Sequence, residues 1–114
     1  DAIMVGANTV IADNPDLRCR IAGREESSPV RIVLDRTAVV SPECVLAQTA
    51  FQTPTWLVVA KQNLADAQKV FAKTAVKVIS ARCVDGHFDL HNVLHHFCNK
   101  GWLTVLLIFR HPAL

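Results

Sequence analysis

The sequence lacks several features that indicate particular classes of protein. Its longest apolar run, residues 103–109 with one threonine inside it, is far shorter than the roughly 20 residues that cross a bilayer. No run of lysine or arginine occurs, and the formal charge is only +2, so nothing indicates binding to nucleic acid or to an anionic membrane. No signal peptide opens the chain, which starts at Asp1. We therefore expect a cytoplasmic protein, and the abrupt start predicts a fragment.

Motifs for metals and dinucleotides are also missing. The four cysteines form no CxxC pair, so we expect reduced, mostly buried thiols rather than a zinc site or a disulfide framework. His91 and His95 are four residues apart, but no HExxH motif or third ligand accompanies them, so we expect no metal. No GxGxxG follows the first apolar run. The HxE and PCxxC pattern is absent, which excludes zinc deaminase activity for this chain.

Apolar runs that suit buried strands alternate with amphipathic helical patterns. The predicted strands cover residues 2–5, 30–34, 55–60, 76–79 and 102–109, with a short extended piece at 38–40. The predicted helices cover residues 7–12, 63–73 and 90–100, with Asn63 and Asp89 as their caps and an Asp85-Gly86 turn before the last. This order predicts an α/β domain with a mostly parallel sheet and helices on both faces. The 114 residues, 51% of them hydrophobic, suffice for one core at most.

Ligands of such sheets bind outside the carboxyl ends of the strands, so we expect a ligand site near residues 6–20 and 35–37. Gly6 would let the chain turn sharply as the first strand ends. A helix that starts at Ala7 or Asn8 would present free N–H groups, which suit a phosphate.

Polar side chains follow in the same stretch. Thr9 adds a hydroxyl, and Asp13 could accept hydrogen bonds from a ribose hydroxyl or a ring N–H. Arg18 and Arg20 would point to opposite faces of an extended segment, so that one of them could clamp a phosphate. The alternative stays open: Thr9 and Asp13 could merely cap a short helix, with Arg20 as a surface charge.

Residues 1–20, DAIMVGANTVIADNPDLRCR, resemble the signature of the reductase domain of the bifunctional riboflavin biosynthesis deaminase/reductase, which reads approximately DAILVGxGTVxADxPxLxxR. The PVRIVLD segment at 29–35 resembles the strand PxRVVLD of that family, and residues 54–58 and 89–101 follow in family order. The resemblance implies a dihydrofolate-reductase-like α/β fold. It also implies that residues 1–114 are the N-terminal portion of an incomplete reductase domain.

The activity that the resemblance implies is NADPH-dependent reduction of the ribosyl group of 5-amino-6-(5-phosphoribosylamino)uracil to the ribityl form. Thr9 and Asp13 match positions that contact NADPH, whereas Leu17 and Arg20 match positions that contact the substrate. Arg36 matches a cofactor-proximal position that is usually small. The resemblance further implies a phosphorylated pyrimidine substrate, a homodimer and fusion to an upstream deaminase. No catalytic residue is identified.

The chain departs from the family pattern where the last strand should run into a Glu-Gly-Gly segment. Residues 109–114 read FRHPAL instead, so the glutamate expected to contact substrate and the glycines expected beside the cofactor are absent. We therefore expect this segment alone to be inactive. Two alternatives remain open: another reductase of this fold with a different substrate, and a non-catalytic binding or dimerisation remnant.

Overall fold

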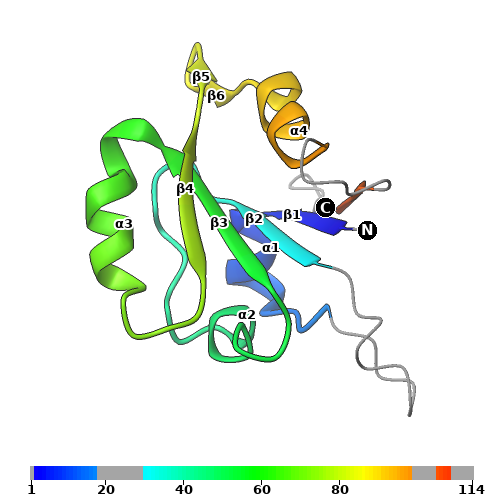
Figure 1. The fold of residues 1–114 in the computed structure, drawn as a ribbon, viewed down its shortest axis with the longest axis vertical. Helices are drawn as coiled ribbons and strands as arrows, with labels where there is room; N and C mark the ends of the chain where they lie inside the picture. The colour runs from blue at the N-terminus through cyan, green and yellow to red at the C-terminus, as the bar shows by residue number, and fades with distance from the viewer. Residues whose placement is uncertain (1, 18–29, 99–104, 109–114) are drawn as a thin grey trace.

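A five-stranded parallel sheet is the centre of the computed structural model, which describes residues 2–17, 30–98 and 105–108 (Figure 1). Its order is β4-β3-β2-β1-β7, and every neighbouring pair is parallel. The strands are β1 (Ala2–Gly6), β2 (Val30–Leu34), β3 (Thr55–Ala60), β4 (Lys77–Ala81) and β7 (Val105–Ile108). The predicted α/β class is thus confirmed. Four predicted strands agree closely; of the fifth, predicted at 102–109, residues 102–104 and 109 lie outside the described residues.

The central strands are buried on both faces. Met4 and Val5 are consecutive in β1 and both fully buried, as are Val58 and Val59 in β3. Since neighbouring residues of a strand point to opposite faces, a strand buried on both faces is apolar at consecutive positions. The continuous apolar runs of the sequence have this cause.

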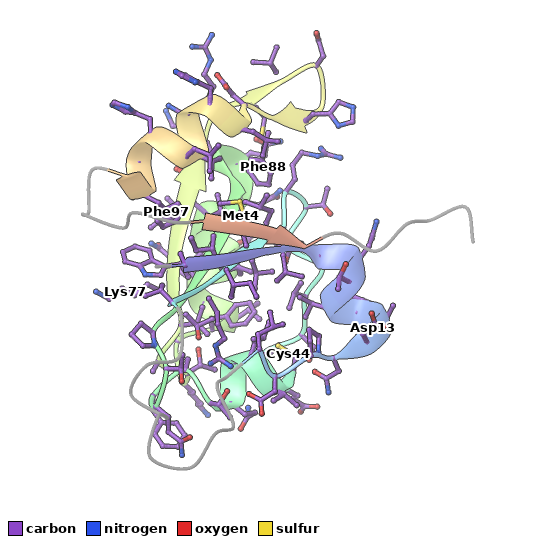
Figure 2. The ribbon with its side chains drawn as sticks, turned by 90° about the vertical axis from the view of Figure 1, so that its right-hand side faces the viewer. Met4, Asp13, Cys44, Lys77, Phe88 and Phe97 are labelled. Atoms are coloured by element: carbon purple, nitrogen blue, oxygen red, sulfur yellow. The ribbon has the colours of Figure 1, made fainter. Side chains whose placement is uncertain are left out.

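Helices cover both faces of the sheet. On one face α1 (Ala7–Asp13), α2 (Val45–Gln48) and α3 (Leu64–Val70) pack over a cluster that includes Val5, Val33 and Leu57. On the other face α4 (Leu90–Cys98) packs Val93 and Phe97 against Met4, Ile32 and Val58 (Figures 1 and 2). Along the chain, β2, β3 and β4 are therefore added in turn on one side of β1, and α4 then leads back to β7 on the other side of β1. The direction reverses between β1 and β7, as in doubly wound folds.

Asn14 ends α1, which extends one residue beyond the predicted helix at 7–12. It adopts the left-handed conformation with φ 43°, and its N–H donates to the Val10 carbonyl over 2.9 Å. Its side-chain Oδ1 accepts a hydrogen bond of 2.9 Å from the N–H of Val45, the first residue of α2. One side chain thus joins the end of one helix to the start of the next.

Three local predictions are wrong. Asn63 stands at the N-cap position of α3, but its side chain makes no capping hydrogen bond; its Nδ2 donates instead to the Arg36 carbonyl over 2.9 Å. The helix itself ends at Val70 rather than at 73, and a 3-10 turn, η2 (Lys61–Asn63), precedes it. Residues 38–40 are not a strand, since Ala38 has φ 57° and the chain there folds back on Asp35.

The segment between β4 and α4 contains a small hairpin, of which only the Asp85-Gly86 turn was predicted from the sequence. Strands β5 (Cys83–Val84) and β6 (His87–Phe88) pair antiparallel across Asp85 and Gly86, both at positive φ. Such a two-residue turn suits the twist of a hairpin. Asp89 then caps α4, because its Oδ1 accepts from the Asn92 N–H over 3.2 Å.

The last features of the fold concern the cysteines and Trp56. Cys44 and Cys83 are free but only half-buried, so the expected burial is not found for these two, whereas Cys19 and the side chain of Cys98 lie outside the described residues. Trp56 is half-buried and packs edge-to-face on Phe97, with ring centroids 5.7 Å apart. No helix in the described part of the chain is long and apolar enough to cross a membrane.

Candidate functional site

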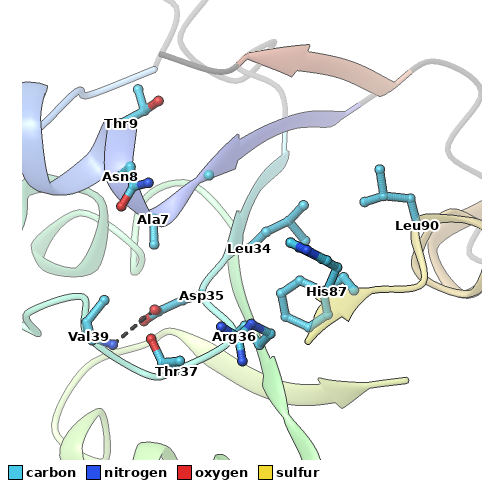
Figure 3. A pocket seen from close by; sticks show the side chains of 12 residues that line it. Ala7, Asn8, Thr9, Leu34, Asp35, Arg36, Thr37, Val39, His87 and Leu90 are labelled. Atoms are coloured by element: carbon cyan, nitrogen blue, oxygen red, sulfur yellow. Dashed lines mark hydrogen bonds between the residues drawn. The ribbon is translucent and has the colours of Figure 1, made fainter. Parts of the chain in front are cut away.

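A pocket of about 410 Å³ opens where β1 and β2 end (Figure 3). Gly6 and Leu34, the last residues of the two strands, are partners in the sheet register, so both strands end at the same level. We name this space the carboxyl-edge pocket. Its described lining residues are Gly6, Ala7, Asn8, Thr9, Leu34, Asp35, Arg36, Thr37, Val39, His87, Phe88 and Leu90. The pocket lies beside the reversal of strand order at β1, the place where ligands of doubly wound sheets bind.

The first wall is the direct passage from β1 into α1. Gly6 has φ −78° and ψ 156°, values that any residue adopts, so the turn itself does not require glycine. Asn8 is exposed at the start of α1, whereas Thr9 is only 6% exposed. The wall thus offers an exposed amide beside a largely buried hydroxyl.

The second wall is the loop after β2, and Asp35 fixes its shape. The Asp35 side chain is fully buried, and its two carboxylate oxygens accept hydrogen bonds from the N–H groups of Val39 and Val40 over 3.0 and 2.9 Å. Its own N–H donates to the Val58 carbonyl in β3 over 2.8 Å. This acid therefore organises the loop rather than facing a ligand (Figure 3).

Arg36 and Thr37 are the residues that this loop exposes to the pocket. The Arg36 carbonyl accepts hydrogen bonds from the Ala60 N–H over 3.1 Å and from the Asn63 side chain over 2.9 Å. The main chain at Arg36 is thus tied to the end of β3, while its guanidinium remains exposed. A cation on a fixed backbone suits recognition of an anion.

The third wall comes from the β5–β6 hairpin and the start of α4. His87, Phe88 and Leu90 line the pocket from this side. His87 is not among the residues predicted for this site from the sequence. The Asp85-Gly86 turn signal could have found it, because that turn follows a parallel strand and so places the hairpin at the carboxyl edge.

Of the four predicted site residues, the three that the structure describes are not brought together in one place. Thr9 lines the carboxyl-edge pocket, whereas Asp13 and Leu17 do not. Asp13 lies at the exposed end of α1, well apart from Phe88 of the hairpin (Figure 2). Leu17 has φ 61° and packs against the core cluster under α1 to α3. Arg20, like Arg18, lies outside the described residues.

Sequence reasoning also missed Arg31, the largest fully buried side chain that the structure describes. Its guanidinium donates to the Asp16 carbonyl over 2.8 Å, to the Leu46 carbonyl over 3.1 Å and to Thr55 Oγ1 over 2.8 Å. The Asp16 carboxylate lies 3.7 Å from the same guanidinium. Arg31 is part of β2, so it anchors the segment after α1 near the amino ends of the strands, away from the pocket. Its role is structural.

Among residues 2–17, 30–98 and 105–108, no three His, Cys, Asp or Glu side chains gather as a metal site. His91 and His95 are both exposed on α4.

Comparison with known proteins decides the family. The family model described as the RibD C-terminal domain matches residues 1–108. The chain belongs to this family. The riboflavin biosynthesis protein RibD of Bacillus amyloliquefaciens is 45% identical over 103 residues, which are 90% of this chain and 27% of that protein. RibD of Actinobacillus pleuropneumoniae is 34% identical over 93 residues, 82% of this chain and 24% of that protein. The chain thus spans about a quarter of the curated relatives it matches.

Solved structures of RibD-like reductases share the fold. A deaminase/5-amino-6-(5-phosphoribosylamino)uracil reductase from Thermotoga maritima matches 93% of this chain and 26% of its own, with a TM-score of 0.68 and 23% identity. The riboflavin biosynthesis reductase Rib7 of Saccharomyces cerevisiae matches 96% of this chain and 48% of its own, with a TM-score of 0.69 and 21% identity. The expected dihydrofolate-reductase-like fold is thereby confirmed. The family is one of reductases in riboflavin biosynthesis.

Proposed function

We propose that this RibD C-terminal domain segment binds NADPH in the carboxyl-edge pocket and serves reduction of the ribosyl group of 5-amino-6-(5-phosphoribosylamino)uracil to the ribityl form. The observation that carries the proposal is the placement of this pocket. It opens at the carboxyl ends of β1 and β2, beside the reversal of strand order, and its exposed polar groups are Asn8, Arg36, Thr37 and His87. The likeness to RibD proteins supports the choice of reaction.

The pocket fits one end of a phosphorylated nucleotide. The exposed groups of Asn8, Arg36, Thr37 and His87 can all donate hydrogen bonds, and the carboxylate of Asp35 is occupied by main-chain N–H groups. Apolar surface from Leu34, Phe88 and Leu90 lies beside these donors. Apolar walls with a few placed polar groups are typical of cofactor sites.

The chain's own residues would bind and orient rather than react. NADPH, when bound, supplies the hydride. Thr9 and the loop held by Asp35 would fix the cofactor's position, and the walls around it would limit the access of water. Asp13 at the cofactor and Leu17 and Arg20 at the substrate remain proposals that rest on the family motif.

The 114 residues would form one part of a longer reductase domain, because the matched yeast reductase is about twice as long. We also propose that the protein carrying this chain has a deaminase domain, since the matched RibD proteins are several times longer. Homodimerisation and a cytoplasmic location stay predictions.

The test uses the protein expressed from its complete coding sequence. We expect saturable NADPH binding in calorimetric titration and NADPH consumption on addition of the phosphoribosylaminouracil substrate. Asp13→Ala and Arg20→Ala should each lower turnover without changing the melting temperature. Absence of NADPH binding by a folded protein would refute the proposed function, and consumption with another pyrimidine or pterin alone would reassign the substrate.

A further inference from the structure

Arg36 has a side chain that the fold itself does not use. In the described part of the chain its guanidinium is exposed and has no hydrogen-bond or ion-pair partner, although its carbonyl accepts two hydrogen bonds. Arg31, five residues earlier, differs from Arg36 in this respect. Its guanidinium donates hydrogen bonds to carbonyl and hydroxyl oxygens inside the protein and so stabilises the fold. A guanidinium without a partner among the described residues, held on a fixed backbone in a pocket, is available for a ligand.

The charge around Arg36 favours an anion. Asp35 is the only acid among the described lining residues, and it is fully buried with both carboxylate oxygens bonded to main-chain N–H groups. The Arg36 guanidinium is therefore not neutralised by a carboxylate that faces the pocket. His87 lines the same pocket from the hairpin and is likewise exposed (Figure 3).

We propose that Arg36 and His87 form a subsite for a phosphate monoester, with the guanidinium fork on two phosphate oxygens and the imidazole as a further donor. Arginine matches phosphate geometry through paired N–H groups. The inference rests on the proposed function, which offers two such groups: the 2′-phosphate of NADPH and the 5-phosphate of the substrate. The first would make the pocket select NADPH over NADH.

Two pairs of probes distinguish these sources without any turnover. The first pair is adenosine 2′,5′-bisphosphate against adenosine 5′-monophosphate, and the second is ribose 5-phosphate against ribose. Calorimetry on the whole protein would measure each pair for wild type, Arg36→Gln and His87→Gln. We expect wild type to prefer the phosphorylated member of one pair by about tenfold or more, as one charge-assisted recognition contact gives. Arg36→Gln should abolish most of this preference, and His87→Gln should reduce it less.

Arg82→Gln is the matched control. Arg82 is an exposed arginine just after β4, but it lines a different pocket together with Lys61 and Cys83. This substitution removes the same charge from the end of β4, which β3 separates from β2, so the phosphate preference of the variant should equal that of wild type. An equal loss in Arg36→Gln and Arg82→Gln would show only a general effect of charge and would overturn the subsite.

The outcomes separate this inference from the proposed function. If Arg36→Gln loses the phosphate preference within the adenosine pair, the subsite belongs to the cofactor. If it loses the phosphate preference within the ribose pair, the subsite belongs to the substrate. Unchanged preferences in Arg36→Gln refute the subsite even if NADPH still binds to wild type. A phosphate preference that depends on Arg36 in a protein that does not bind NADPH would keep the subsite and refute the proposed function.

Discussion

Replacing Arg31 by methionine should destabilise the protein by about 3–5 kcal/mol, the usual cost of breaking a buried charged network. The side chain is fully buried and donates to the carbonyls of Asp16, Leu46 and Thr53 and to Thr55 Oγ1. Methionine fills similar space but leaves the Asp16 and Leu46 carbonyls without this donor. Each buried acceptor that loses its partner costs about 1–3 kcal/mol, and these costs are not additive.

Urea unfolding of the whole protein would measure the loss, and Arg31→Lys separates charge from geometry. Lysine keeps the positive charge but has one ammonium group, which cannot reach Leu46, Asp16 and Thr55 at once. We expect it to lose about half as much stability as methionine. A methionine variant that loses less than about 1 kcal/mol, or a lysine variant as stable as wild type, would refute this account of Arg31.

Three further predictions concern the loop after β2 and the α4 face. Ala38→Gly should raise the free energy of unfolding by up to about 1 kcal/mol, because Ala38 has φ 57°; a lower urea midpoint would contradict this. Asp35→Ala should lower the free energy of unfolding by about 2–4 kcal/mol, since two main-chain N–H groups lose their acceptor, and it should also weaken NADPH binding. Undiminished NADPH binding in titration would show that the shape of the loop does not depend on this carboxylate. Phe97→Ala should cost about 3–5 kcal/mol and speed hydrogen exchange in α4, because the side chain is fully buried; unchanged exchange would argue against its packing role.

The sheet could be predicted because each of its strands is marked by a local apolar run. The helix α2 could not, since the four residues Val45–Gln48 show no periodicity and a side chain far back in the chain, Asn14, supports their start. The two strands of the hairpin have only two residues each, too few for an alternating pattern. Local sequence patterns thus fail to predict an element that is very short or that depends on a residue distant in the chain.

The site was predicted in part for the same reason. Thr9 was found because it follows the first strand directly, and Arg36 entered through the family resemblance. His87 comes to the pocket through the hairpin, and its one sequence signal is the Asp85-Gly86 turn after a predicted strand, which was not connected with the site. The burial of Arg31 depends on Asp16 and Thr55, which meet it only in three dimensions. A charge inside an apolar strand is the single sequence sign of such a network.

The register of β1 sets the order in which this domain can assemble during synthesis. Ala2 pairs with Val30 in β2 on one side and with Val105 in β7 on the other. The strand β7 therefore leaves the ribosome about a hundred residues after β1. At ordinary translation speeds this delay lasts about 5–20 seconds. Throughout that time the backbone N–H and C=O groups along this edge of β1 lack their native partners, which leaves an open strand edge on the nascent chain until β7 pairs with it.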